Sequence, residues 1–191
     1  MGLLALFRRK PHERAGFTLY GAAVAAARDP WFFAELGVPD TLDGRFDLVG
    51  LQVSLLIRRL RRDSDPRGPA LAQAVFDAMF ADMDVNLREM GVSDLRVGQR
   101  VRGMWEAFHG RCQAYEAALD AGGEALARTA LAAALRRNVW RAGPDAGQVA
   151  GEGRLAAQVM RTAEALAGQP FASLLRGEAR FPAPREAVDD A

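Results

Sequence analysis

The stretch GRFDLVGLQVSLLIRRLRR, residues 44–62, is apolar on nearly every side when it is drawn as a helix. One stripe covers about 100° of the circumference and consists of Phe46, Val49, Val53, Leu56, Ile57 and Leu60. A second stripe, on the opposite side, consists of Leu48, Leu51 and Leu55. Because a helix that is apolar all round is normally buried, we predict that this helix lies at the centre of the fold. Its apolar part covers only about 12 residues and includes Asp47, so it is too short and too polar to span a membrane.

The sequence on both sides of this stretch is also helical in pattern, and turn-forming residues separate the segments. No stretch shows the alternation that is typical of a strand. We therefore predict an all-α fold, a single compact domain of six to seven helices with a mobile C-terminal tail. The expected helices are 18–28, 44–62, 70–90, 96–121, 124–141 and 148–167, with short turns at 31–36 and 169–176. The expected divisions are an N-terminal basic and apolar segment (1–16), a helical domain (17–176) and a disordered tail (177–191).

Composition excludes several classes of function. The 25 basic and 24 acidic residues nearly cancel, which argues against binding DNA by bulk charge. The single cysteine, Cys112, permits neither an internal disulfide nor a cysteine-based zinc site. The apolar start followed by Arg8, Arg9 and Lys10 has the wrong charge order for a secretory signal. A weak membrane-surface anchor and a frayed terminus both stay open for this segment.

Charged side chains follow the predicted helix 70–90 and its end. Asp82 and Asp84 point about 160° apart on a helix, so they do not form a metal site. Asp84 instead lies four residues before Arg88, the spacing of a surface ion pair. These charges are either ordinary helix-surface ion pairs or a face that recognises a partner. The candidate partner-binding residues of this group are Asp77, Asp82, Asp84, Arg88, Glu89 and Asp94.

Two further groups are candidates for binding. A basic run ends the core helix and could contact anionic lipid, RNA phosphates or an acidic peptide; it consists of Arg58, Arg59, Arg61 and Arg62. An aromatic run could be a hydrophobic plug or a binding site; it consists of Trp31, Phe32 and Phe33. His109 and Cys112 share a helix face, but no third metal ligand and no oxyanion-hole motif accompany them. We therefore expect no enzyme activity, no cofactor, no metal and no small-molecule substrate.

Four blocks of sequence are more specific than composition and helical periodicity. The first runs from ARDPWFF (27–33) into GVPDTLDGRFD (37–47), and the second is LIRRLR (56–61). The third runs from FDAMFADMD (76–84) into LREMGVSDLRVG (87–98). The fourth joins AFHGR (107–111) and Ala114-Tyr115 to LAAALRRNV (131–139). With these blocks the chain resembles the ubiquinol–cytochrome c chaperone family, the assembly factors for cytochrome b of the bc1 complex, over about residues 19–140.

The resemblance implies a non-catalytic assembly chaperone that binds newly made cytochrome b, in nascent or apo form, and assists assembly of the bc1 complex. Mitochondrial members also involve a small partner protein and the ribosome exit. Without an import presequence, we expect a bacterial-type member that is cytoplasmic or peripheral on the cytoplasmic face of the inner membrane. Three positions depart from the family pattern: Gln52 replaces a histidine, Arg136 an aromatic residue and His109 a tyrosine.

A physical hypothesis fits these features. A chaperone for unassembled membrane segments needs an apolar groove with a charged rim, and Leu48, Leu51 and Leu55 could line it. Cytoplasmic loops of membrane proteins carry excess Lys and Arg, which the acids of helix 70–90 could contact. The arginines of the basic run could contact anionic lipid or ribosomal RNA. The alternative is a ribosome- or RNA-binding adaptor at the membrane, which needs a continuous positive face around that run.

Overall fold

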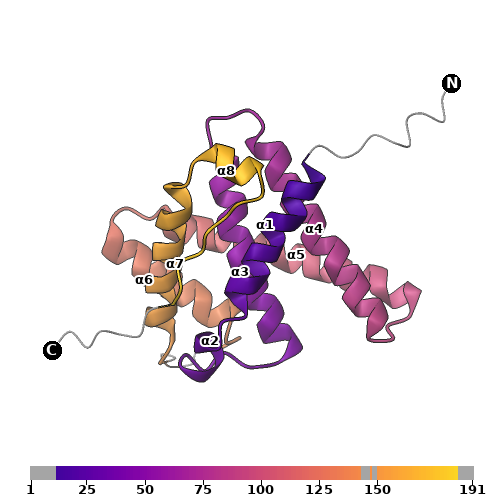
Figure 1. Cartoon of the computed structure of the whole chain (residues 1–191). Coiled ribbons are helices and arrows are strands. Elements are labelled where there is room, and N and C mark those ends of the chain that lie inside the picture. Colours follow the sequence, from indigo (N-terminus) through magenta and orange to yellow (C-terminus); the bar gives the residue numbers. More distant parts are fainter. Residues whose placement is uncertain (1–11, 143–146, 148–149, 185–191) are drawn as a thin grey trace.

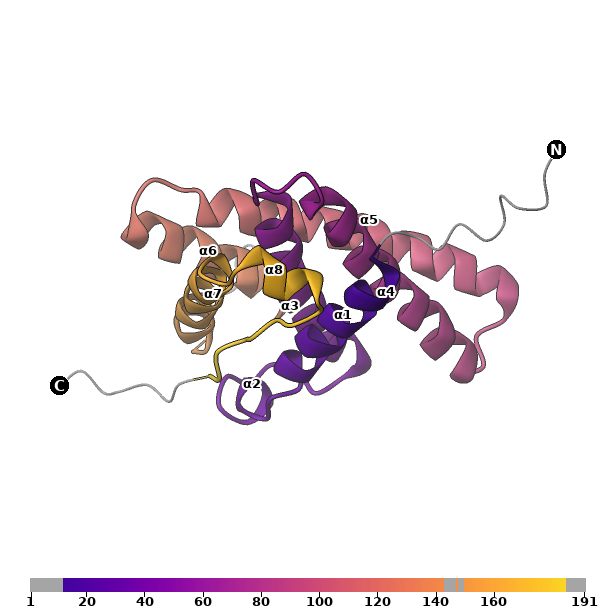
Figure 2. The same cartoon turned by 45° about the horizontal axis from the view of Figure 1, so that its top comes forward.

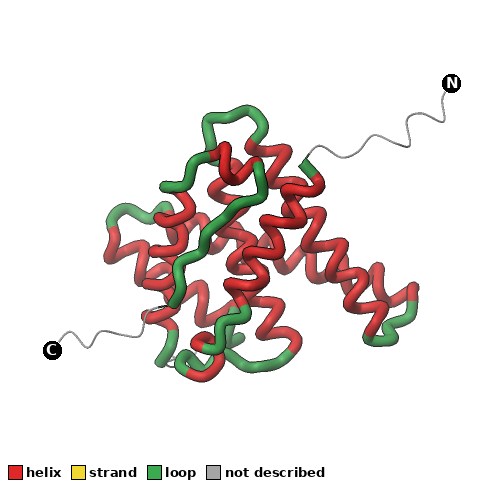
Figure 3. The backbone as a smooth tube through the Cα atoms, viewed as in Figure 1, coloured by secondary structure: helices red, strands yellow, loops and turns green. Residues whose placement is uncertain are grey.

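The chain folds into a bundle of helices in a computed structural model that describes residues 12–142, 147 and 150–184. Within these residues there is no strand (Figure 3), which confirms the predicted all-α class. Six long helices and the one-turn helices α2 and α8 account for the expected six to seven helices and short turns. Their bounds are α1 (Glu13–Ala27), α2 (Trp31–Ala34), α3 (Leu42–Arg61), α4 (Gly68–Glu89), α5 (Asp94–Leu119), α6 (Glu124–Asn138), α7 (Glu152–Ala167) and α8 (Phe171–Leu175).

Helix α3 lies at the centre, as predicted from its apolar surface (Figure 1). It packs against α1, α4, α5 and α7, so that most of its circumference is covered. The stripe of Leu48, Leu51 and Leu55 is buried, with exposed fractions between 0% and 2%. The hypothesis that these leucines line an open groove is therefore wrong: the packed helices cover this side of α3 completely.

Small residues bring α1 and α4 into close contact. A Cβ atom added to Gly16 would lie 2.6 Å from the backbone carbon of Ala74, so only glycine fits at this crossing. Further along α1, Ala23 and Ala27 are buried and leave room for the facing helices. The alanine-rich sequence of α1 thus allows two helix backbones to approach closely.

Helix α7 belongs to the core. Its Leu155, Ala156 and Leu166 are fully buried, and it packs against α6 and α3. Part of the expected tail is also packed. The backbone N–H of Arg180 donates to Gln169 (2.8 Å), and Phe181 packs against the core. The packed part of the chain therefore continues past residue 176, and residues 185–191 lie outside the described residues.

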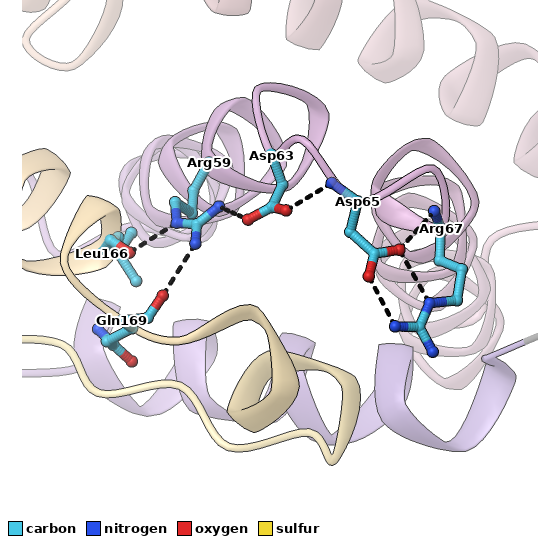
Figure 4. Close-up of polar contacts among 6 residues, drawn as sticks. All are labelled: Arg59, Asp63, Asp65, Arg67, Leu166 and Gln169. Atoms are coloured by element: carbon cyan, nitrogen blue, oxygen red, sulfur yellow. Dashed lines mark hydrogen bonds and ion pairs between the residues drawn. The ribbon is translucent and has the colours of Figure 1, made fainter.

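Arg59 ties the end of α3 to the end of α7 (Figure 4). Its guanidinium donates to the carbonyl oxygens of Leu166 (2.9 Å) and Gln169 (2.8 Å). These carbonyls lie at the C-terminal end of α7, where backbone acceptors lack partners within the helix. The same guanidinium pairs with Asp63 (2.6 Å). Asp63 in turn accepts from the backbone of Asp65, which orders the loop into α4.

The joined ends of α4 and α5 stand out from the body, on the side away from α6 and α7 (Figures 1 and 2). We call residues 82–105 the arm. Among the first fifteen residues of α5, 94–108, only Val97 and Phe108 are buried. The arm is therefore a helical hairpin with most of its surface uncovered.

Candidate functional site

A groove of about 1440 Å³ lies between the arm and the body. Residues from α1, α2, α3, α4, α5 and α6 line it, so its shape depends on how these six helices pack. Its apolar lining includes Val24, Phe33, Leu42, Phe46, Val49, Met83, Leu87, Met90 and Met104. Leu42 and Met90 are exposed to 57% and 49%, so apolar side chains reach solvent at the groove.

Methionine is prominent in this lining. Met83, Met90 and Met104 are three of the six methionines of the chain. A methionine side chain is unbranched and polarisable, so it adapts its shape to different apolar surfaces. On α3 the groove is lined by Phe46 and Val49, which belong to the stripe opposite the one that we expected.

Arginines and aspartates also line the groove; they are Arg28, Arg45, Arg100, Arg111, Arg137 and Arg141, with Asp40, Asp43 and Asp82. We call these nine residues the rim. Two pairs lie within it, Arg45 with Asp40 (2.6 Å) and Arg141 with Asp43 (3.0 Å).

Three of the rim arginines have no carboxylate partner among the described residues. In the part of the chain that the structure describes, Arg28, Arg100 and Arg137 form no ion pair and their side chains make no hydrogen bond, and all three are exposed. The rim therefore presents guanidinium groups that no carboxylate of the described residues neutralises.

Asp47 lies beneath this rim and is 1% exposed. Arg111 (2.5 Å) and Arg141 (3.2 Å) both pair with its carboxylate. Burial raises the pKa of Asp47, and the two arginines oppose that increase. The polar residue inside the core helix thus positions two guanidinium groups of the groove, one of them from α5 and one from the segment after α6.

Tyr20 and Asp82 join α1 to the base of the arm. The Tyr20 hydroxyl donates to Oδ2 of Asp82 (2.6 Å), and both residues line the groove. Burial, and secondly this hydrogen bond, raise the pKa of Tyr20, so its hydroxyl stays protonated and continues to donate. This contact fixes one side of the groove.

Comparison with known proteins assigns the chain to a family. The sequence matches the family described as Ubiquinol-cytochrome C chaperone over residues 34–181. The chain belongs to the ubiquinol–cytochrome c chaperone family. This family assignment confirms the resemblance drawn from the sequence blocks, and it makes the protein a chaperone by family.

A solved structure agrees with this assignment. The crystal structure of the Cbp3 homolog from Brucella abortus is 36% identical in sequence to this chaperone, with a TM-score of 0.76. The similarity covers 95% of this chain and 97% of that chain. A comparison with curated proteins gave no match.

The acidic candidates of the chaperone are spread over different places. Asp82 lines the groove, but its carboxylate accepts from Tyr20. Asp77 accepts from Gln73 (2.8 Å), and Glu89 is exposed on α4. Arg88 pairs with Asp84 (2.6 Å) and with Asp94, so these three residues brace the turn at the tip of the arm. The predicted spacing of Asp84 and Arg88 is thus confirmed as an ion pair, while a role in partner binding stays a prediction.

The basic run at the end of α3 is used largely inside the fold. Arg58 (2.5 Å) and Arg62 both pair with Asp120 at the end of α5. Arg59 is occupied at the end of α7, and Arg61 is exposed. This run does not present the continuous positive surface on which the RNA-binding alternative was based. Contact with the ribosome or the membrane stays a prediction.

The three residues of the aromatic run lie in three different environments. Phe32 is buried in the core with 1% exposure. Trp31 is half-buried, and the guanidinium of Arg154 lies over its ring at 5.2 Å. Phe33 alone of the three lines the groove.

His109 and Cys112 do not form a site with other ligands. His109 stacks on Trp105 at 4.0 Å between ring centroids. Burial raises the pKa of Cys112 to about 12, which keeps its thiol protonated near neutral pH. Among the described residues, no three His, Cys, Asp or Glu side chains gather as a metal site would require. No described helix has the length and apolar character needed to cross a bilayer.

Reasoning from the sequence missed the unpaired rim arginines. Arg28, Arg100 and Arg137 are far apart in the chain, and each is an ordinary exposed arginine in its own segment. No local pattern marks them, because only the packing of α1, α5 and α6 brings them to one groove. The methionines of α4 were the available signal, but their spacing is equally typical of a core stripe.

Proposed function

We propose that this chaperone binds newly made cytochrome b and that the groove between the arm and the body holds an apolar segment of it. The observation that carries the proposal is the groove itself, with a methionine-rich apolar lining and a charged rim. The family assignment supplies the bc1 complex as the context of assembly. The proposed site of action is the cytoplasmic face of the membrane.

The groove has the chemistry that such a client requires. Before assembly, the membrane-spanning segments of cytochrome b are apolar and aggregate in water. Covering one face of such a segment removes apolar area from water, which stabilises the complex by about 25 cal/mol for each Å² buried. Flexible methionine side chains accept segments of different shape, as a chaperone with several apolar segments to protect needs.

A pair of exposed leucines permits a matched test in cells. Leu42 borders the groove with 57% exposure, and Leu126 on α6 is 64% exposed and outside the groove lining. A strain of the source organism that lacks this gene is complemented with the wild type, with Leu42→Asp as the groove variant, or with Leu126→Asp as the control. Reduced-minus-oxidised spectra of membranes then report the b-type signal of the bc1 complex. Pulse-labelling reports how much newly made cytochrome b co-purifies with the chaperone.

The groove variant is expected to lose the b-type signal and the co-purifying cytochrome b while its transcript is intact. The Leu126 variant is expected to behave as the wild type. Normal spectra in the groove variant would contradict the placement of the site. Normal spectra in the strain without the gene would contradict the function itself.

A further inference from the structure

We infer that the groove selects apolar segments that carry acidic side chains at their ends. This inference rests on the proposed function, because it describes the client that the groove accepts. It differs from the expectation that acids of the chaperone meet basic loops of the client, since most of those acids lie outside the groove.

The rim of the groove carries a net positive charge. Six arginines stand against three aspartates, and Asp47 beneath them adds one further carboxylate, so the groove stays positive. Arg45 and Arg141 are paired within the rim, and Arg111 is paired with Asp47. The arginines that are left are Arg28, Arg100 and Arg137, and the carboxylate of Asp82, which accepts from Tyr20, offsets one of their three charges in the sum.

These three arginines come to the groove from different parts of the fold. Arg28 follows the last residue of α1, Arg100 lies on α5 in the arm, and Arg137 lies near the end of α6. They come from three elements that surround one apolar lining. A client segment lying in the groove would place carboxylates near them, and a guanidinium binds a carboxylate through paired hydrogen bonds.

A peptide fits this surface better than a lipid headgroup does. Asp40 and Asp43, paired with Arg45 and Arg141, interrupt the positive charge of the rim, whereas an anionic bilayer is bound best by an unbroken basic surface. The apolar lining is concave and spans several helices, which suits an inserted side-chain surface, whereas a bilayer presents a flat sheet of headgroups. Mixed charges around an apolar centre are typical of protein recognition.

Two synthetic peptides test the inference with the full chain. Both carry a fluorescent label and the same amphipathic helical centre, one with Glu and Asp at both ends and the other with Lys. Fluorescence anisotropy is measured at low and high salt. The rim variant is Arg28→Ser/Arg100→Ser/Arg137→Ser. The control variant, Arg61→Ser/Arg96→Ser/Arg102→Ser, removes three exposed arginines that do not line the groove.

The acidic peptide is expected to bind the wild type roughly tenfold more tightly than the basic peptide at low salt. That preference is expected to shrink at high salt and to vanish in the rim variant, while the control variant keeps it. Equal binding of the two peptides would overturn the inference and leave the proposed function standing. Loss of the preference in both variants would overturn it in favour of bulk charge.

A lipid is tested in parallel. Phosphatidylglycerol vesicles that displace the acidic peptide from the wild type, and that bind the rim variant weakly, would overturn the peptide assignment and give the rim to a lipid. Vesicles that leave the peptide bound support it. If neither peptide binds, the proposed client site fails together with this inference.

Discussion

Two groups of arginines in this chaperone differ in almost every respect. Arg58, Arg59 and Arg62 lie within five consecutive residues, and the fold uses all three to join helix ends. Arg28, Arg100 and Arg137 are scattered in the sequence, and the fold brings them unpaired to one groove. The arginines that are clustered in the sequence therefore hold helix ends together. The arginines that line the groove are brought together only by the packing of the helices.

The physical reason is position on the helices. Arg59 reaches the carbonyl groups at the end of α7, which carry partial negative charge, and Arg58 and Arg62 reach the carboxylate of Asp120 at the end of α5. The rim arginines lie beside apolar side chains and face solvent. One group should therefore control stability, and the other should control binding with little effect on stability.

The largest effect is expected from Arg59→Ala. This change removes the hydrogen bonds of the guanidinium to the carbonyls of Leu166 and Gln169 and its ion pair with Asp63. We expect the free energy of unfolding to fall by about 2–4 kcal/mol. Denaturant titration measures this loss, and hydrogen exchange should show that α7 opens first. The neighbouring change Arg61→Ala, at an exposed position, should stay within about 0.5 kcal/mol. Similar losses for both variants would erase the distinction drawn between the arginine groups.

The next largest effect concerns the helix crossing that supports the groove. Gly16→Ala places a Cβ atom against the backbone of Ala74, and we expect a loss of about 1–3 kcal/mol from overpacking. Gly21 lies in the same helix with nothing within 4 Å of an added Cβ. Gly21→Ala should therefore raise stability by about 0.5–1 kcal/mol. Thermal unfolding of both variants measures the change in stability, which should be negative for Gly16→Ala and positive for Gly21→Ala. Changes of the same sign would refute the close approach of α1 and α4.

A smaller effect depends on pH. Arg67 binds Asp65 and lowers the pKa of that carboxyl from its usual 3.8 to about 2. The stabilisation is then complete above about pH 4 and is lost as the pH falls toward 2. The difference in unfolding free energy between the wild type and Asp65→Asn should be constant near neutral pH and shrink over that acidic range. Denaturant titration at several pH values measures it. In an Arg67→Ala background the same difference should keep only part of its pH dependence, because the backbone N–H of residue 67 still donates to Asp65.

The smallest effect on stability is expected from the rim. The variant Arg28→Ser/Arg100→Ser/Arg137→Ser removes no ion pair to a described residue. Its free energy of unfolding should stay within about 0.5 kcal/mol per site of the wild type. A loss comparable to that of Arg59→Ala, measured by the same titration, would mean that the rim arginines hold the fold rather than face a client.

Local patterns in the sequence predicted the helices well. The predicted core helix 44–62 is α3, Leu42–Arg61, and the predicted 70–90 is α4, Gly68–Glu89. Apolar periodicity and turn residues act within one segment, so they can be read without knowledge of the neighbours. The ion pair of Asp84 with Arg88 was predictable for the same reason.

The candidate site was predicted less well, because it depends on contacts between segments. Both apolar stripes of α3 are equally plausible as a groove in the sequence, yet the Leu48 stripe is covered and Phe46 and Val49 line the groove. Which stripe is covered depends on where α4 and α7 pack. The use of Arg59 at the end of α7, more than a hundred residues away, has no local signal either.

The central claim is that the groove between arm and body holds cytochrome b. A photo-crosslinking amino acid placed at Leu42, and in a second variant at Leu126, tests it in cells that make tagged cytochrome b. These positions are similarly exposed, but only Leu42 lines the groove. We predict a crosslink to newly made cytochrome b from position 42 and none from position 126. A crosslink from position 126 alone would contradict the account.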